Sequence, residues 1–221
     1  MILETATQRT DDWYAARCGK ATASRFNDVV ARKKPSAKQK KDGAPGDPTA
    51  ERQNYLTELV VERLTGQPVP AYENAAMRWG AEQEAAARAA YEQRTGVAVE
   101  ETGFIAHDVL MAGCSPDGLV DWDGLIEIKC PYNSAVHIET LLGGMSADHM
   151  LQVQGQMWIT GRQWCDFVSY DPRMPAELQL YVQRIHADPK AIADLAFGIS
   201  AFLKEVGSKV EALRRLAEGK K

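Results

Sequence analysis

Apolar residues recur at helical spacing along most of the chain and at strand-like spacing in its middle. The helical segments are 10–17, a short one opening at 22–24, 55–64, 74–94, 134–142, 147–159 and 192–216. The strand-like segments are 97–106, 110–112, 119–120, 125–128, 165–170 and 178–185. This order predicts one mixed α/β domain over residues 1–221, with a central mixed β-sheet flanked by helices and an amphipathic C-terminal helix over 188–219.

Residues 32–48 interrupt this pattern. They begin RKKPSAKQKKDGAPG, a run rich in basic residues that contains almost nothing apolar. Such a composition predicts a flexible basic loop. Two interpretations stay open, because a solvated linker and a basic arm that contacts phosphates share this composition.

Composition narrows the class of protein. Hydrophobic residues make up 45% of the 221 and charged residues 25%, which excludes wholesale disorder. Twenty-six Lys and Arg against 30 Asp and Glu give a net charge of −4, which argues against a protein that coats nucleic acid with its whole surface. A basic groove on an acidic body remains compatible with it. No apolar run is long enough for a membrane span, and the start does not resemble a secretory signal, so a cytoplasmic chain is expected.

The cysteines and histidines are scattered. Cys18, Cys114, Cys130 and Cys165 form no CxxC pair, and the four histidines form no HxxxH motif. A structural zinc site or a zinc hydrolase would need closer spacing, so we expect reduced cysteines and no zinc.

The segment with the most chemical information is 115–129. In a strand, alternate residues share a face, so Ile126 and Ile128 should enter the core while Glu127 and Lys129 lie together on the other face. If this pair stood alone, a surface ion pair of little energetic value would be the favoured interpretation. Asp117, however, ends a segment that a turn at 121–124 would return beside Glu127.

Two converging carboxylates supply the oxygen ligands that Mg²⁺ prefers, and the backbone carbonyl of Ile128 is a natural third ligand. Beside them, Lys129 would orient and help to deprotonate an attacking water, or offset charge on a phosphoryl transition state. Asp117, Glu127 and Lys129 therefore predict metal-assisted phosphodiester hydrolysis.

Further polar residues have two interpretations each. Glu84 lies on the 74–94 helix, as a fourth site residue or as a solvated helix carboxylate. Gln152 and Gln156 share a helix face, where they would hold a water or phosphate or simply be exposed.

The form P-D-(x)n-E-x-K is weakly specific by itself, but several motifs accompany it in order. They are Trp13-Tyr14-x-x-Arg17-x-Gly19-x-x-Thr22-Ala23-Ser24, Arg78-Trp79-Gly80-x-x-x-Glu84, Cys114-Ser115-Pro116-Asp117-Gly118-Leu119, Glu127-Ile128-Lys129-Cys130-Pro131, Gln152-Val153-Gln154-x-x-Met157-Trp158 and Tyr170-Asp171-Pro172-Arg173-Met174. Over about residues 8–186, the chain resembles the YqaJ-type viral recombinase nucleases, the phage lambda exonuclease family within the PD-(D/E)xK superfamily.

This resemblance implies roles for individual residues. It makes Asp117, Glu127 and the Ile128 carbonyl metal ligands for Mg²⁺, with Mn²⁺ able to substitute, and it makes Lys129, Glu84 and Gln152 catalytic. Arg17, Ser24 and Ser115 match the positions that hold the 5′-phosphate of the degraded strand. An arginine fork with two hydroxyls suits a terminal dianionic phosphate better than an internal diester.

The resemblance also implies a fold and partners. It predicts a restriction-endonuclease-like core in a ring-shaped homotrimer that threads duplex DNA and resects it 5′→3′. The remaining 3′ overhang would pass to a single-strand annealing recombinase. Lys33 and Lys34 are expected to contact DNA in the channel, although residues 32–41 and 44–49 depart from the family pattern. Met77 matches an apolar wedge that parts terminal base pairs, or else it is a buried helix methionine.

Two other functions compete with an exonuclease. A structure-specific or restriction-type endonuclease would use the same metal site, and the predicted 5′-phosphate pocket is the feature that distinguishes them. A DNA-end binding module with a degenerate site is disfavoured because every expected acidic and lysine position is filled.

Overall fold

The structure is a computed structural model that describes residues 2–4, 6–70 and 73–219. Its helices are α1 (Asp11–Arg17), α2 (Phe26–Val30), α3 (Ala37–Lys41), α4 (Ala50–Thr65), α5 (Ala75–Thr95), α6 (Ser134–Gly143), α7 (Met150–Thr160) and α8 (Pro189–Glu218). Its strands are β1 (Ile2–Glu4), β2 (Ala21–Thr22), β3 (Val99–Glu100), β4 (Phe104–Ala106), β5 (Ala112–Cys114), β6 (Gly118–Val120), β7 (Gly124–Lys129), β8 (Trp164–Tyr170) and β9 (Leu180–His186). The predicted mixed α/β class is confirmed.

The strands form two sheets where one was expected. A five-stranded sheet has the order β3-β6-β7-β8-β9, and a four-stranded sheet has the order β1-β4-β5-β2. Each mixes parallel and antiparallel pairs, since β7 and β8 are parallel and so are β2 and β5. The predicted single strand over 97–106 is wrong because it breaks into β3 and β4, which join different sheets. Between them, the carbonyl of Thr102 accepts a hydrogen bond from the Gln8 side chain.

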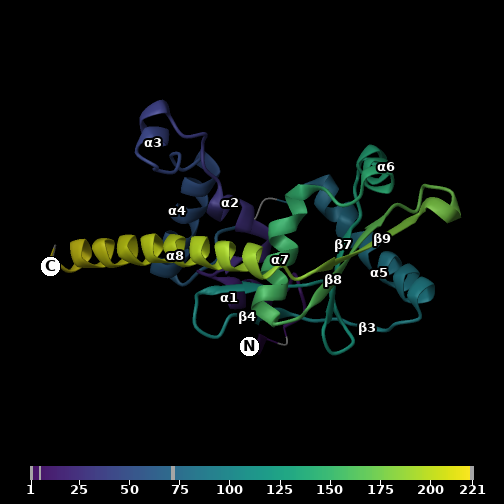
Figure 1. The fold of residues 1–221 in the computed structure, drawn as a ribbon. Helices are drawn as coiled ribbons and strands as arrows, with labels where there is room; N and C mark the ends of the chain where they lie inside the picture. The colour runs from purple at the N-terminus through teal and green to yellow at the C-terminus, as the bar shows by residue number, and fades with distance from the viewer. Residues whose placement is uncertain (1, 5, 71–72, 220–221) are drawn as a thin grey trace.

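Helices cover both faces of the five-stranded sheet. Helix α5 packs on one face through Ala87 and Tyr91, in a core with Ile126 and Ile128 of β7. Helix α7 packs on the other face through Val153 and Met157, against residues of β7 and β8. Figure 1 shows α8 running past α4 and α7, and its C-terminal part extends away from this sheet. Within the described residues, no helix is both long and apolar enough to cross a membrane.

The ends of the helices follow the sequence in most places. The Thr10 hydroxyl accepts a hydrogen bond from the Trp13 N–H at the start of α1, and Gly96 ends α5 with φ +73°. The short helix expected to open at 22–24 is present, but it begins without a side-chain capping bond. Thr22 ends β2 and makes no side-chain capping bond, and a 3₁₀ turn (Ala23–Arg25) separates it from α2.

Residues 32–48 are more ordered than the loop that their composition predicted. They form a segment that projects from the body (Figure 1) and contains α3, which begins with a capping box between Ser36 and Gln39. At the base of the segment, Arg32 and Pro48 pair as an isolated bridge, and the Lys33 N–H donates to the Asp47 carbonyl. Proline-free helix formers at 37–41 allow this helix despite the charge.

Candidate functional site

The β6–β7 hairpin brings the predicted acidic residues together. Gly118 pairs with Ile126, which places Asp117 immediately before the first residue of β6. The Ile128 N–H donates to Asp117 Oδ2 over 2.6 Å. Because the N–H and C=O of a strand residue point to the same edge, the Ile128 carbonyl also lies on the Asp117 side. The predicted return of the chain beside Glu127 is confirmed.

Glu127 is a buried carboxylate with several donors. It is only 2% exposed, so the interpretation as a surface ion pair is wrong. Lys129 Nζ and Gln152 Nε2 each lie 2.6 Å from its Oε1. Gln156 Nε2 lies 2.6 Å from its Oε2. Both glutamines come from α7, and the interpretation that they are merely exposed is wrong as well.

The neighbouring charges shift the pKa values of Asp117 and Lys129. Burial, and then the negative charges of Glu127 and Glu84, raise the pKa of Asp117 well above its ordinary value. Burial alone would lower the pKa of Lys129, but the carboxylates of Glu127 and Asp117 outweigh it and raise that pKa. Lys129 is therefore held as an ammonium, which favours orientation and charge compensation over proton removal.

The donor set fits a hard divalent cation. Asp117, Glu127 and the Ile128 carbonyl offer oxygen ligands at one edge of the sheet, and a cation would offset the repulsion that raises the pKa of Asp117. Across residues 2–4, 6–70 and 73–219, however, no three His, Cys, Asp or Glu side chains are grouped to hold a metal. The protein would therefore supply a metal ion with two carboxylates and one backbone carbonyl.

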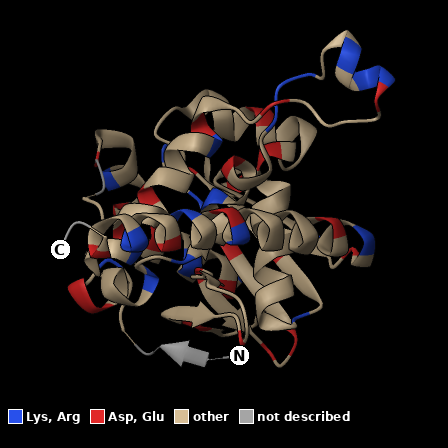
Figure 2. Ribbon diagram, turned by 90° about the vertical axis from the view of Figure 1, so that its left-hand side faces the viewer, with Lys and Arg blue, Asp and Glu red and all other residues tan. Residues whose placement is uncertain are grey.

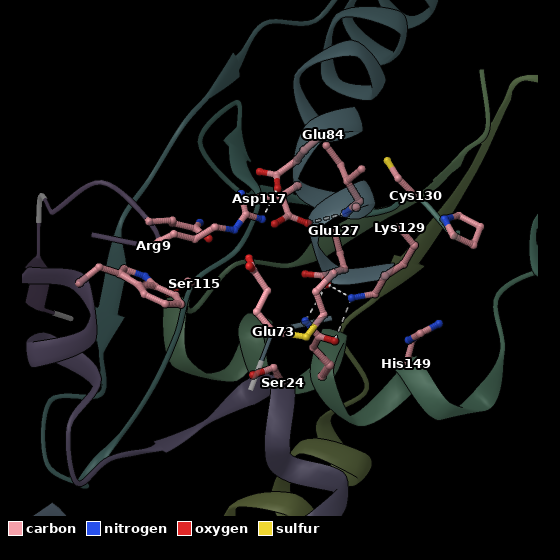
Figure 3. A pocket seen from close by; sticks show the side chains of 18 of the residues that line it. Arg9, Ser24, Glu73, Glu84, Ser115, Asp117, Glu127, Lys129, Cys130 and His149 are labelled. Carbon is pink, nitrogen blue, oxygen red and sulfur yellow. Dashed lines mark hydrogen bonds and ion pairs between the residues drawn. The ribbon is translucent and has the colours of Figure 1, made fainter. Parts of the chain in front are cut away.

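Glu84 lies on the α5 side of the same region and is engaged in ion pairs. Its Oε2 is 2.6 Å from Arg9 Nη2, and its Oε1 is 3.3 Å from Arg88 Nη2. Its side chain is 17% exposed, so it is not a freely solvated helix carboxylate. Figure 3 shows Arg9 approaching Glu84 and Asp117 from the opposite wall. Arg9 has φ +69°, a left-handed conformation that is costly for a non-glycine residue.

Trp13 joins two of the three predicted phosphate ligands, Arg17 and Ser115, and Ser24 lines the same cavity. The guanidinium of Arg17 stacks 4.0 Å from the centre of the Trp13 ring, and Trp13 Nε1 donates to Ser115 Oγ over 2.9 Å. Ser24 is exposed, and its hydroxyl lies 3.4 Å from that of Thr22. Burial lowers the pKa of Arg17. Its desolvated cation and two hydroxyls form a set of donors suited to a phosphate.

The Tyr170–Met174 motif holds the segment that follows β7 at the border of the site. Arg173 makes bidentate contacts with buried Asp171, and it donates to the carbonyls of Pro131 and Tyr132. Its guanidinium also lies 4.6 Å from the centre of the Trp79 ring. These contacts fix the chain that follows β7, where Pro131 lines the cavity.

One cavity of about 890 Å³ contains nearly all the predicted residues. Its lining includes Arg17, Ser24, Met77, Glu84, Ser115, Asp117, Glu127, Ile128, Lys129 and Gln152. Met77 is 52% exposed, so its interpretation as a buried methionine is wrong. Lys33 and Lys34 do not line this cavity, and both are exposed on the projecting segment. Their contact with DNA stays a prediction.

Three residues in or next to this cavity make contacts that the sequence motifs do not indicate. Trp13 was visible in the first motif, but nothing in the motif indicates that it joins Arg17 to Ser115. Gln156 was visible by its spacing from Gln152, yet only the fold reveals its contact with Glu127. Arg9 gave no signal, since a left-handed backbone is not encoded by residue type here.

The comparisons with known proteins agree with this geometry. Residues 12–163 match the family model of the YqaJ-like viral recombinase domain. The chain belongs to this family. The comparison with curated proteins gives no match. The match to the family model confirms the resemblance that the motifs indicated.

Solved structures extend the match to nearly the whole chain. An alkaline exonuclease, LHK-Exo, from Laribacter hongkongensis is 45% identical, with a TM-score of 0.84 over 96% of this chain and 100% of that one. The same protein in complex with dAMP matches equally well. A phage-related exonuclease from Haemophilus somnus 129PT shares the fold at 18% identity, with a TM-score of 0.68 over 88% of this chain and 96% of that one.

Proposed function

We propose that this chain is a Mg²⁺-dependent DNA exonuclease that resects linear duplexes from 5′-phosphorylated ends. It would act 5′→3′, release 5′-mononucleotides and leave a 3′ single-stranded overhang. One observation carries the proposal: a single cavity contains both the Asp117–Glu127–Lys129 set and the Arg17–Ser24–Ser115 set. Metal-assisted cleavage and capture of a terminal phosphate are thereby adjacent.

The comparisons support this activity. The chain covers the full length of an alkaline exonuclease at 45% identity, and that relative forms a complex with dAMP, a deoxynucleoside monophosphate. A 5′-mononucleotide is the product that the proposed cleavage would release. Resection to a 3′ overhang is also consistent with a family described as viral recombinase domains.

The chain's own residues divide the work. Asp117, Glu127 and the Ile128 carbonyl would hold Mg²⁺, or Mn²⁺ in its place, and the bound ion supplies a Lewis acid at the scissile phosphate. Lys129 orients the attacking water and offsets negative charge on the phosphoryl group. Gln152 holds Glu127 and Lys129 in register, through contacts of 2.6 and 3.3 Å. Glu84 completes the acidic wall.

Arg17, Ser24 and Ser115 bind the terminal phosphate of the strand being degraded. A terminal monoester carries more negative charge than an internal diester, so an arginine with two hydroxyls selects the end of the strand. Met77, exposed at the same cavity, would part the end base pairs. After each cleavage, a new 5′-phosphate can enter the same pocket.

The assembly is part of the proposal. One chain of 221 residues does not encircle a duplex, and a ring of three copies would thread it and deliver the surviving strand to a single-strand annealing recombinase. Light scattering on the purified chain should give the mass of a homotrimer. A monomer at micromolar concentration would contradict the ring but leave the cavity chemistry intact.

The activity is tested on matched substrates. With Mg²⁺, 5′-phosphorylated linear duplex should yield mononucleotides and covalently closed circles should survive. Asp117→Asn and Lys129→Ala should abolish cleavage and retain DNA binding. Cleavage of closed circles would favour the alternative, a structure-specific or restriction-type endonuclease on the same fold.

The phosphate pocket is tested separately from the metal site. Arg17→Ala should lower kcat/KM on 5′-phosphorylated ends by about 10- to 100-fold, as expected for one charge-assisted contact, with a smaller loss on 5′-hydroxyl ends. Equal losses on both substrates would contradict a pocket for the terminal phosphate.

A further inference from the structure

Gln156 is a buried polar residue that the fold does not fully satisfy. Its side chain lies on α7 and is 1% exposed. Its Nε2 donates to Glu127 Oε2 over 2.6 Å, but in the described part of the chain its Oε1 is buried with no hydrogen-bond partner. An unpaired buried oxygen costs folding free energy, so such a group calls for an explanation.

Gln154, on the same helix, is a buried glutamine whose side chain is fully hydrogen-bonded within the fold. It is 2% exposed, almost as buried as Gln156. Its Nε2 donates to the His186 carbonyl over 2.9 Å, and its Oε1 accepts from the Asp188 N–H over 2.8 Å. Both ends of its amide are used, and they tie α7 to the start of α8.

The two glutamines that contact Glu127 divide its oxygens between them. Gln152 donates to Oε1 and Gln156, one helical turn further on, donates to Oε2. Lys129 also contacts Oε1, whereas Gln156 is the described donor to Oε2. A carboxylate oxygen has two lone-pair positions, so a donor on one of them fixes the carboxylate and leaves the other for a cation.

We propose that Gln156 is a positioning residue for the metal site and is retained for Glu127 at the expense of stability. The inference rests on the proposed function, because it takes Glu127 as a metal ligand. Groups that hydrogen-bond a ligating side chain typically change metal affinity by about 10- to 100-fold when they are removed. The unpaired Oε1 predicts, in addition, that an apolar residue at this position is tolerated by the fold.

Gln156→Met and Gln154→Met form a matched pair on one helix, with Gln156→Leu as a second apolar replacement. Mn²⁺ binding to the full chain without DNA is measured by calorimetry, and stability is measured by urea denaturation without metal. Gln156→Met should weaken Mn²⁺ binding by about 10- to 100-fold and lower the urea midpoint less than Gln154→Met does, because only one end of the Gln156 amide is hydrogen-bonded. Gln154→Met should lower the midpoint and leave the Mn²⁺ dissociation constant unchanged.

Each other outcome is decisive. An unchanged Mn²⁺ dissociation constant in Gln156→Met would overturn the positioning role. If the wild type still bound Mn²⁺, the proposed metal site itself would stand. Misfolding of both Gln156 variants, or a midpoint loss like that of Gln154→Met, would assign Gln156 to the fold. Mn²⁺ binding that is absent from the wild type, or unaffected by Asp117→Asn, would instead remove the metal site and this inference with it.

Discussion

At the scale of single residues, Trp13 joins two members of the proposed phosphate-binding set, Arg17 and Ser115, that lie far apart in sequence. Its ring stacks on Arg17 and its indole N–H binds Ser115. Trp13 is 9% exposed and also belongs to a small core with Phe104. One side chain therefore positions a cation and a hydroxyl at once.

Replacing Trp13 with Phe separates these two contributions. The aromatic face remains for Arg17, but the donor to Ser115 is lost. One neutral hydrogen bond is worth about 0.5–1.5 kcal/mol, so the preference for 5′-phosphoryl over 5′-hydroxyl ends should fall about 2- to 12-fold. The measurement is the ratio of kcat/KM on the two substrates. Trp122→Phe, at an 83% exposed position, should not change that ratio.

Asp171 gives the structure a defined sensitivity to acid. Hydrogen bonds from Arg173 lower its pKa from 3.8 to about 2. A carboxylate whose pKa is depressed in the folded state stabilises the protein above its unfolded pKa and loses that contribution as pH falls through its folded pKa. The contribution is therefore present at pH 7 and is lost between about pH 4 and pH 2.

Asp171→Asn should lower the free energy of unfolding at pH 7 by about 2 kcal/mol, from the size of that shift. Urea denaturation at a series of pH values should show the gap to wild type closing as pH drops below about 4. Asp194→Asn is the control, since Asp194 forms an exposed i,i+4 pair with Lys190. A constant gap at all pH values would contradict the ionic origin of the effect.

At the scale of elements, α7 lies between the five-stranded sheet and helices α2 and α8. One face carries Gln152 and Gln156 toward Glu127. Another packs through Gly155 against Phe26 of α2, where an added Cβ would approach the ring to 2.4 Å. The position of the site glutamines thus depends on a close contact between helices outside the site.

Gly155→Ala should destabilise the fold by about 1–3 kcal/mol because the added methyl group overpacks this contact. It should also reduce cleavage, since α7 must shift. Gly207→Ala in α8 is the matched control, as an added Cβ meets nothing within 4 Å there. That variant should gain about 0.5–1 kcal/mol from helix propensity. Equal urea midpoints for the two variants would contradict the packing argument.

At the scale of the whole molecule, the distribution of charge matters more than its sum of −4. Figure 2 shows acidic and basic residues mixed over the body, whereas basic residues dominate the short helix of the projecting segment. That segment bears Lys33, Lys34 and α3. Lys33 and Lys34 do not line the cavity, so a contact of theirs with DNA would lie outside it.

Replacing Lys33 and Lys34 with Gln tests whether the segment contacts DNA. Each phosphate contact contributes about 0.9 to the slope of log affinity against log salt, so the slope should fall by about 2. Lys190→Gln with Lys204→Gln on α8 removes the same charge from another surface and should leave the slope nearly unchanged. Equal slopes for the two double variants would identify the segment as a solvated linker.

Sequence by itself determined the local features. Period-two alternation at 125–129 fixed which faces Ile126 and Glu127 occupy, and Gly96 marked the end of α5, because these depend on neighbours a few residues away. Tertiary structure decided the division into two sheets, the burial of Glu127 and the contacts of Trp13, Arg9 and Gln156. The hydrogen bonds of these three residues with Ser115, Glu84 and Glu127 join positions 29 to 102 apart. No local pattern specifies such partners, since they follow from how helices and strands pack together.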